Sequence, residues 1–505
     1  MIMKVLNAEQ IRSADAYTIN NEPILSIDLM ERAAKACYTW IKNNIDKNKE
    51  IFVFCGMGNN GGDGLAISRM LLKSGYSVTV LKILHKEKAS EDFQINEKRL
   101  QKLKTAKYLD VNKYEEIPPI PAAAVVVDAM LGSGLNSPLK GLLAEIVAHI
   151  NKLAADIISI DLPSGLFCEN NTQNVPDSII MATHTLSFQV PKLAFFLNEN
   201  ERFVGKWHIL DIGLDENFIN SIDSDYLTVT KDMLRPFFRR RRNFAHKGDF
   251  GHALLLAGSR GKSGAAILAA NAAIRSGLGL LTVSTPASCY IPIQTAVPEA
   301  MCLVDDNDTC ICCLADISGY NVVGAGPGIG LEKQTHNVIK LLIQNSAKPL
   351  VLDADALNIV AENPTWLSFL PKFSILTPHP GEMDRITGKV ESGFERLQKA
   401  RECALKYSIY IVLKGAYTAI VCPDGKVFFN MTGNPGMATG GSGDVLTGII
   451  LSLLAQGYLP GESALMGVYL HGLSGDIAAT RYSLEALKAG DIIDNIGKAI
   501  KKTFY

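Results

Sequence analysis

The feature that most constrains the fold is a short run of β-branched and other apolar residues that recurs between amphipathic stretches. These runs do not alternate with polar residues, so each predicted strand should be covered on both faces, which is typical of a parallel sheet with crossover helices. In the first half the predicted strands are Ile51–Cys55, Val78–Leu84, Ala124–Asp128 and Ile157–Asp161. The predicted helices between them are Asp63–Leu72, Glu91–Lys104 and Leu139–Leu153.

This alternation stops where charged and turn residues accumulate at Asp211–Tyr226, so we place a domain boundary near residue 225, between 1–224 and 225–505. Two runs around Pro423-Asp424-Gly425, Ala416–Cys422 and Lys426–Asn430, predict a hairpin added to a second α/β sheet. The other strands predicted there are Ala253–Ala257, Leu281–Ser284, Asn321–Gly324, Pro349–Asp353 and Ile409–Leu413, with helices at Ser263–Ser276 and Asp444–Leu454.

Composition limits the classes of function. The chain of 505 residues carries 50 basic and 51 acidic side chains, so its net charge of −1 offers no general attraction to nucleic acid or anionic lipid. Ten cysteines are too dilute for a disulfide scaffold, and neither an export signal nor a membrane span is visible, so we expect a cytoplasmic protein.

Two short motifs receive no functional role. The run Arg239–Arg242 is typical of a solvated linker or an interface surface, although four arginines could also bind phosphate. The cysteines of Cys310-Ile311-Cys312-Cys313 alternate within an apolar run, which favours buried thiols over soft-metal ligands.

Polar residues follow three of the predicted strands in the first half. The glycine-rich loop Gly56–Gly64 joins a strand to a helix, and Asp128 and Asp161 each end a strand before another glycine-containing loop. Carboxyl ends of parallel strands meet at one edge of a sheet, so we expect Asn60, Asp63, Asp128, Asp161 and Ser164 to converge in one crevice. Helix caps and Asx turns would explain each residue singly, but they explain the set poorly.

These residues also suggest a chemistry. Oxygen ligands with a single carboxylate suit a loosely held hard cation, and a monovalent ion is plausible. Asp161, at its strand end, is well placed to act as an acid or base on a neighbouring ligand.

A second site is predicted near the C-terminus, where the glycine-rich segment Asn434–Gly443 runs into an apolar helix that begins with Asp444. Backbone N–H groups at a helix N-terminus bind anions, and a carboxylate there would repel phosphate unless it removes a proton. We therefore predict that Asp444 is a general base beside a phosphoryl-binding cradle.

The Gly-x-Gly-Asp at this cradle resembles the ribokinase superfamily. The segment Thr377–Glu382 is similar to the Thr-Pro-Asn-x-x-Glu of the vitamin kinases in that superfamily, except that His379 replaces Asn. With that segment, the cradle and the further motifs His246–Gly248, Gly258–Ala266, Gly326–Gly330 and Lys414–Thr418, the second half is similar to the NAD(P)H-hydrate dehydratase family. The motifs of the first half resemble the matching epimerase family.

The resemblance covers nearly the whole chain and implies two activities on one damaged cofactor. The first half would interconvert the R and S epimers of hydrated NADH and NADPH (NADHX and NADPHX) at C6. The second half would dehydrate the S epimer to NAD(P)H at the expense of ADP, or of ATP, giving AMP and phosphate in the case of ADP. The implied fold is a Rossmann-like three-layer α/β/α domain followed by a ribokinase-like α/β domain.

The resemblance also implies roles for individual residues. In the first half, Asp161 is the acid or base, and K⁺ lies among Asn60, Asp128 and Ser164. The hydrate is bound by Asn59, Asn60, Gly61, Gly62, Asp63, Gly132, Ser133, Gly134, Leu135, Asn136, Ser137, Pro138 and Asp161. In the second half, Asp444 is the base, and it binds the hydrate with Ala265, Gly328 and His379. The nucleotide, accompanied by Mg²⁺, is bound by Lys414, Gly415, Ala416, Tyr417, Thr418 and Gly443.

Two alternatives remain at this point. A kinase of a small vitamin alcohol would fit the second half alone, but His379 and the attached first half argue against it. A scaffold in RNA assemblies would fit relatives of the first half, but Asn60, Asp63, Asp128 and Asp161 disfavour that role. We expect small-molecule substrates, no nucleic acid, no membrane and a homo-oligomer.

Overall fold

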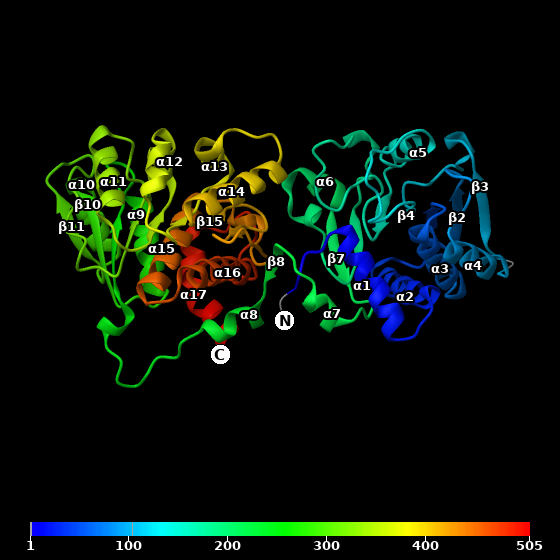
Figure 1. The fold of residues 1–505 in the computed structure, drawn as a ribbon, viewed down its shortest axis with the longest axis horizontal. Coiled ribbons are helices and arrows are strands. Elements are labelled where there is room, and N and C mark those ends of the chain that lie inside the picture. The colour runs from blue at the N-terminus through cyan, green and yellow to red at the C-terminus, as the bar shows by residue number, and fades with distance from the viewer. Residues whose placement is uncertain (1–2, 104) are drawn as a thin grey trace. The chain divides into compact units, whose positions relative to one another are not determined.

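The computed structural model describes residues 3–103 and 105–505. The chain divides into two compact units at Ser224 and Asp225, and Met3 belongs with the second unit. Each unit carries its own sheet (Figure 1). All nine strands that were predicted outside the hairpin are present, with shifts of at most two residues at their ends. The predicted hairpin is also present.

The first unit contains a sheet of seven parallel strands. In spatial order the strands are β3 (Lys107–Val111), β2 (Val78–Ile83), β1 (Ile51–Cys55), β4 (Val125–Ala129), β5 (Asp156–Ile160), β6 (His184–Phe188) and β7 (Lys206–Leu210). Three of them, β3, β6 and β7, were not predicted.

Helices cover both faces of this sheet. Side chains alternate along β1, so Val53 packs against one helical layer and Phe54 against the other. One layer contains α2 (Ser26–Asn44), α3 (Asn59–Lys73) and α4 (Glu91–Gln101), and the opposite layer contains α5 (Leu142–Ile150). The helices α1 (Ala8–Asn21), α6 (Glu201–Val204) and α7 (Glu216–Ser221) complete the unit. This is the expected three-layer α/β/α arrangement. Lys104, the expected end of α4, lies outside the described residues.

The strand order reverses direction at β1 and β4, and ligands in open α/β sheets bind outside the carboxyl ends of strands at such a point. The loop after β1 leads into α3, the loop after β4 contains Gly132–Leu135, and Asp161 follows β5 directly. The topology therefore brings the three predicted loops to one edge.

The second unit is built on a ten-stranded sheet, in which β16 pairs antiparallel with both of its neighbours and every other pair is parallel. In spatial order its strands are β11 (Met301–Asp305), β10 (Leu280–Pro286), β9 (His252–Leu256), β12 (Val322–Ala325), β13 (Leu350–Leu352), β14 (Ile375–Leu376), β15 (Tyr410–Leu413), β16 (Ala419–Val421), β17 (Val427–Asn430) and β8 (Tyr226–Val229). Mixed sheets of this size, with helices on the parallel strands, fit the expected ribokinase-like class.

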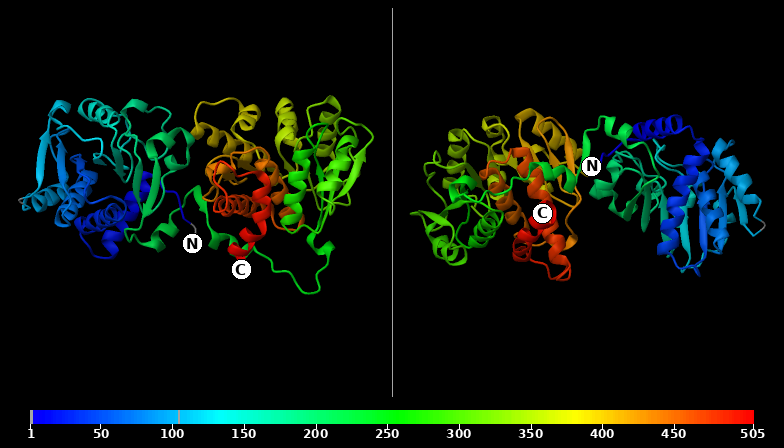
Figure 2. Two further views of the ribbon diagram at one scale, coloured as in Figure 1. Left: turned by 180° about the vertical axis from the view of Figure 1, so that it is seen from behind. Right: turned by 90° about the horizontal axis from the view of Figure 1, so that it is seen from below.

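A large core on one face of this sheet joins helices that are far apart in the sequence. In Figures 1 and 2, α9 lies beside α15 and α17, and the apolar faces of these helices and of α16 form one cluster. Their bounds are α9 (Ser263–Arg275), α15 (Ser442–Ala455), α16 (Pro460–Ala479) and α17 (Ala489–Phe504). The remaining helices are α8 (Lys231–Leu234), α10 (Ala287–Ala296), α11 (Lys333–Asn345), α12 (Ala354–Glu362), α13 (Pro380–Thr387) and α14 (Gly393–Tyr407).

The structure corrects one prediction about the motifs without a role and agrees with another. Cys310 is buried, but Cys312 is half-buried and Cys313 is exposed, because the segment is a loop after β11 and not an apolar strand. The arginine run lies in an exposed loop, where Arg241 stacks on Phe250. In the part of the chain described, no helix has the length and apolarity needed to cross a membrane.

Candidate active sites

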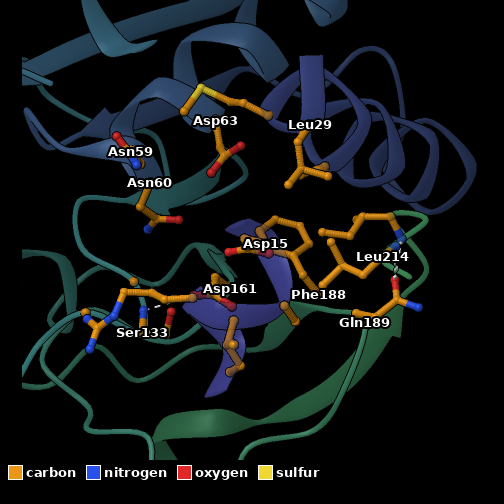
Figure 3. Close-up of a pocket in the computed structure, with 18 of the residues that line it drawn as sticks. Asp15, Leu29, Asn59, Asn60, Asp63, Ser133, Asp161, Phe188, Gln189 and Leu214 are labelled. Atoms are coloured by element: carbon orange, nitrogen blue, oxygen red, sulfur yellow. Dashed lines mark hydrogen bonds between the residues drawn. The ribbon is translucent and has the colours of Figure 1, made fainter. Parts of the chain in front are cut away.

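The first unit contains a cavity of about 610 Å³ at the edge of its sheet. Polar side chains from the start of α3 and from the residue after β5 point into it, among them Asn60, Asp63 and Asp161 (Figure 3). The opposite wall is apolar and includes Leu29 and Phe188. The predicted residues that line the cavity are Asn59, Asn60, Asp63, Gly132, Ser133, Gly134, Leu135 and Asp161.

Several predicted site residues do not line this cavity. Gly61 and Gly62 are packed too closely against their neighbours to carry a side chain. A Cβ at Gly61 would lie 1.7 Å from the Gly56 carbonyl oxygen, and a Cβ at Gly62 would lie 2.8 Å from the Met30 sulfur. Asp128 and Ser164, which we expected to converge with the others in one crevice, are buried and are not part of the cavity wall. Asn136, Ser137 and Pro138 also lie outside the cavity wall.

Asp128 and Ser164 form a buried network between the ends of two strands. The Asp128 carboxylate accepts hydrogen bonds from Ser159 Oγ (2.8 Å), from the Ser164 backbone N–H (2.8 Å) and from Ser164 Oγ (2.6 Å). Ser164 Oγ also accepts from the backbone N–H of Leu131, at 2.9 Å. The network ties the loop after β4 to the loop after β5, and so fixes the floor of the site.

Asp161 occupies a strained position immediately after β5. Its φ of +65° lies in the left-handed region, which a non-glycine residue adopts only where the surroundings hold it. The carboxylate accepts a hydrogen bond from the Ser133 backbone N–H (2.9 Å) and pairs with Lys192 Nζ (2.9 Å). Burial alone would raise the pKa of Asp161, but the Lys192 ammonium and the hydrogen bonds from Ser133 lower it overall.

Lys192 is the counter-charge at this site, and the sequence interpretation missed it. Its side chain is 0% exposed, and lysines are almost never fully buried unless they are paired with an opposite charge. The ammonium donates to Ser187 Oγ (2.6 Å) and to the Phe188 carbonyl (3.3 Å) in addition to its contact with Asp161. No glycine loop or motif flags this residue, because its burial is set by tertiary packing.

Asp15 and Asp63 also line the cavity, and Asp15 was not predicted from the sequence. Burial and the neighbouring Asp161 charge raise the pKa of Asp15 to about 6. The same two causes raise the pKa of Asp63 well above its ordinary value. The cavity therefore combines one carboxylate held in its ionised form with two carboxyl groups whose pKa is raised.

The side-chain amide of Asn60 is buried in the cavity without hydrogen-bond partners. Both its amide nitrogen and its amide oxygen are buried, and neither has a hydrogen-bond partner. An unsatisfied buried amide costs about 1–3 kcal/mol, so it is a place where a ligand or ion is expected.

In the second unit the glycine-rich segment leads into α15, as predicted. Gly441 adopts φ of +89° at the N-cap, and a Cβ at Gly443 would lie 3.3 Å from Lys414 Nζ. Asp444 stands in the first turn, and no hydrogen bond or ion pair holds its carboxylate among the described residues. Burial and the nearby Asp353 charge raise its pKa to about 7, although Lys414 opposes this shift.

A buried charge network lies beside this helix. Asp353, which is 1% exposed, accepts hydrogen bonds from Lys414 Nζ and from Thr447 Oγ1, both at 2.7 Å. Lys414 Nζ also lies 3.9 Å from a Glu382 carboxylate oxygen. The sequence interpretation placed Asp353 only as a strand end, because its pairing with a residue 61 positions away has no local signal.

His379 forms the N-cap of α13. Its Nδ1 accepts hydrogen bonds from the backbone N–H groups of Gly381 (3.0 Å) and Glu382 (3.3 Å). The Glu382 carboxylate accepts in return from the His379 backbone N–H, at 2.8 Å. Nε2 of the same ring lies 3.4 Å from Glu382 Oε1, and the side chain is 48% exposed. The exposed part of the ring can contact a ligand.

The remaining predicted residues of the second unit lie at the start of α9, in the loop after β12 and in a turn. Ala265 and Gly328 meet, since a Cβ at Gly328 would lie 3.1 Å from the Ala265 Cβ. Gly415 to Thr418 form the turn between β15 and β16, closed by Thr418 Oγ1 donating to the Gly415 carbonyl at 3.0 Å. Tyr417 in this turn has φ of +55°.

Comparison with known proteins places both halves. Residues 26–194 match the family described as YjeF-related protein N-terminus, and residues 253–498 match NAD(P)H-hydrate dehydratase. The bifunctional NAD(P)H-hydrate repair enzyme of Moorella thermoacetica is 36% identical, over 97% of this chain and 96% of the relative. The corresponding Escherichia coli enzyme is 30% identical, over 98% of this chain and 93% of the relative. The chain belongs to the bifunctional NAD(P)H-hydrate repair enzyme family.

Within this family of repair enzymes, the cavity lies in the epimerase half and the glycine cradle in the dehydratase half. A solved ADP/ATP-dependent NAD(P)H-hydrate dehydratase from Bacillus subtilis, co-crystallised with ATP and Mg²⁺, is 33% identical. That comparison has a TM-score of 0.48 and covers 55% of this chain and 98% of the solved chain.

Proposed function

We propose that the first unit epimerises NADHX and NADPHX at C6 through Asp161, and that the second unit dehydrates the S epimer through Asp444 with ADP. The observation that carries the proposal is that each half places one aspartate beside a glycine-containing loop: Asp161 directly follows β5, and Asp444 lies in the first turn of α15, after the glycine-rich segment. The two sites are separate, so the two reactions can be assigned separately.

In the epimerase half, Asp161 acts on the C6 hydroxyl of the hydrate. This carbon bears both the hydroxyl and the ring nitrogen, so transfer of the hydroxyl proton makes the stereocentre reversible. Lys192 keeps Asp161 ionised and thus ready to accept that proton. The apolar wall with Leu29 and Phe188 suits the nicotinamide ring, while Ser133 and Asn60 supply polar contacts.

We propose that this half binds K⁺, because several oxygen atoms at the site can still accept an ion. The Asn60 amide oxygen lacks a partner, which fits a cation held by neutral oxygens. Asp128 and Ser164 are already bonded to each other, so they would contribute their remaining lone pairs. When bound, the ion would supply a fixed positive charge near the substrate.

In the dehydratase half, Asp444 removes the proton of the C6 hydroxyl. The hydroxyl oxygen then attacks the terminal phosphorus of ADP, a bond to phosphorus forms, and the phosphoanhydride bond breaks to release AMP. Phosphate leaves from C6, and loss of a proton from C5 restores the dihydropyridine ring. With a pKa near 7, Asp444 can hold and release a proton at neutral pH.

The nucleotide is proposed to lie between the turn Lys414–Thr418 and the N-terminus of α15. Backbone N–H groups near Gly443 and the Lys414 ammonium suit its phosphates. Tyr417 in the turn offers a ring to adenine, with ATP as the alternative donor. Ala265, Gly328 and His379 remain the proposed contacts to the hydrate.

Mg²⁺ fits the charge network of this half. Among the residues that the structure describes, no three His, Cys, Asp or Glu side chains are grouped as a metal cage. This suits Mg²⁺, which keeps several waters and is held by one or two carboxylates together with phosphates. Asp353 and Glu382 would hold it, and it would neutralise phosphate charge.

Mixed R and S hydrate incubated with the full chain tests the proposal. With ADP and Mg²⁺ both epimers should convert to reduced nucleotide, and without ADP the epimers should interconvert but not dehydrate. Dehydration at the same rate without nucleotide would contradict it. Phosphorylation of a vitamin alcohol would favour the kinase alternative. A homo-oligomer and a cytoplasmic location remain predictions.

A further inference from the structure

Asp15 points into the epimerase cavity without any structural duty that explains it. It lies in the middle of α1, whose N-terminus is already capped by Asn7 and Gln10. Its carboxyl group faces the same cavity as Asp63 and Asp161 (Figure 3). No hydrogen bond or ion pair joins it to another residue in the described parts of the chain. A half-buried carboxyl group without a hydrogen-bond partner costs free energy unless it serves a ligand.

The charges in the cavity restrict which carboxyl group is ionised. Lys192 Nζ lies 2.9 Å from Asp161 and contacts neither Asp15 nor Asp63. One ammonium compensates one carboxylate, and further negative charges close together in a buried site are strongly disfavoured. Asp161 is therefore the ionised member, Asp63 favours its protonated form, and Asp15 takes up and releases a proton near pH 6.

Asp63 and Asp15 differ in how readily they give up a proton. Asp63 is 8% exposed, its Oδ1 has no partner, and its pKa is raised well above the ordinary range, so it stays protonated. Asp15 is half-buried, and its pKa of about 6 allows proton exchange near neutral pH. Two carboxyl groups with opposite pKa shifts in one pocket are the usual arrangement of an acid and a base.

We propose that Asp15 is the general acid that works opposite Asp161 in the epimerase half, an inference that rests on the proposed epimerase function. Asp161 takes the proton of the C6 hydroxyl, and the O–H electron pair forms a C6 carbonyl. The bond between C6 and the ring nitrogen breaks, its electron pair goes to nitrogen, and Asp15 supplies the proton that this nitrogen gains.

The ring-opened aldehyde then rotates about the C5–C6 bond and presents its other face. Nitrogen attacks the carbonyl carbon, Asp15 recovers its proton from nitrogen, and Asp161 returns a proton to oxygen. No oxidant, reductant or further reactant is needed, and both groups end the cycle as they began.

Several other charged side chains lie near Asp15. They are Arg12 on its own helix, Asp63 on α3, Asp92 at the start of α4, Asp161 after β5 and Lys192 after β6. Asp92 accepts a hydrogen bond from Ser26 Oγ at 2.7 Å, on the helix next to it. Of these groups, Asp161 and Lys192 are the ones that act on the pKa of Asp15, in opposite directions.

Asp15→Asn in the full-length chain tests the proposal, with Glu9→Gln as the matched control on the exposed face of the same helix. We expect epimerisation by Asp15→Asn to fall by about 10²–10⁴-fold, the usual worth of general acid–base catalysis. Dehydration of the S epimer should be unchanged in both variants. Glu9→Gln should retain wild-type epimerisation, and Asp15→Glu should recover part of the lost rate.

The pH profile separates an acid from a structural residue. Because the acid form of Asp15 is required, wild-type epimerisation should decline as pH rises above the pKa of Asp15, and this alkaline decline should be absent from Asp15→Asn. Wild-type turnover and an unchanged profile in Asp15→Asn would overturn the proposal, as would a loss explained entirely by a lower unfolding temperature. If wild-type protein does not epimerise at all, the proposed function fails and not only the role of Asp15.

Discussion

The two halves of this chain use an aspartate in the same kind of place but tune it in opposite directions. In the epimerase half, Lys192 contacts Asp161 directly and the pKa of that carboxyl group is lowered. In the dehydratase half, Lys414 contacts Asp353 and leaves Asp444 without a partner, and the pKa of Asp444 rises to about 7. The contact that the neighbouring lysine makes therefore sets the direction of the pKa shift of each aspartate, and the position of the aspartate beside a glycine-containing loop does not.

Asp444→Asn should give the largest effect in the dehydratase half. We expect dehydration to fall by about 10²–10⁴-fold, because a general base is lost while the helix and its cradle remain. Epimerisation, followed by chromatography that resolves the two epimers, should be unchanged. Near wild-type dehydration would mean that Asp444 is a helix-terminus residue and not a base.

Asp161→Asn should give the mirror result in the epimerase half. Asparagine tolerates the left-handed backbone that Asp161 adopts, so this change removes the charge with little added strain. We expect the R epimer to be consumed only at its spontaneous rate, a loss of about 10²–10⁴-fold, while the S epimer is still dehydrated. Asp161→Ala should lose stability as well, by about 1–2 kcal/mol, because alanine disfavours that backbone. Normal consumption of the R epimer by Asp161→Asn would remove its catalytic role.

Lys192→Met tests the cause of the difference between the halves. It leaves the buried Asp161 charge without a partner, which costs about 3–5 kcal/mol in a buried pair. The lowered pKa of Asp161 contributes stability above the pKa of the unfolded state, and that contribution is lost as pH falls. The loss in thermal unfolding should therefore be greatest at neutral pH and shrink in acid. An equal loss at both pH values would argue for packing alone.

The pH dependence of dehydration sharpens the comparison further. Asp444 must be ionised to act, so dehydration should rise with pH through about 7 in wild-type protein. Epimerisation should already have its base ionised well below that pH. Coincident ascending limbs for the two reactions, measured on one preparation, would contradict opposite tuning.

The smallest effect is expected at Tyr417, which lies in the nucleotide turn with φ of +55°. A left-handed backbone costs a non-glycine residue about 1–2 kcal/mol, so Tyr417→Gly should recover part of that cost in thermal unfolding. If the ring stacks on adenine, the KM for ADP should rise in the same variant. An unchanged KM would mean that the ring points away from the nucleotide.

The sequence predicts the central strands because they are uninterrupted apolar runs. The edge strands β3 and β11 were missed, since their residues are mostly exposed and their composition resembles that of a loop. β6 and β7 contain histidine, lysine and serine, which weaken the same signal. Helix α1 carries no long apolar run and was also missed.

The candidate sites divide in a similar way. Glycine loops before helices have a local signature, so Asn60, Asp63 and Asp444 could be predicted to lie at sheet edges. Lys192 and Asp15 could not, because their importance comes from packing against residues far away in the sequence. Burial of Asp128 and Ser164 below the cavity depends on their hydrogen bonds to each other, which residue spacing does not specify.

Mixing Asp161→Asn with Asp444→Asn tests the central claim most directly, namely that two aspartates in two separate sites perform two reactions. Each full-length variant is incubated alone and together with the other, with the R epimer, ADP and Mg²⁺, and formation of reduced nucleotide is followed. Each variant alone should convert the R epimer poorly, and the mixture should restore conversion, because one chain epimerises and the other dehydrates. A mixture no faster than the better of the two variants alone would contradict the account.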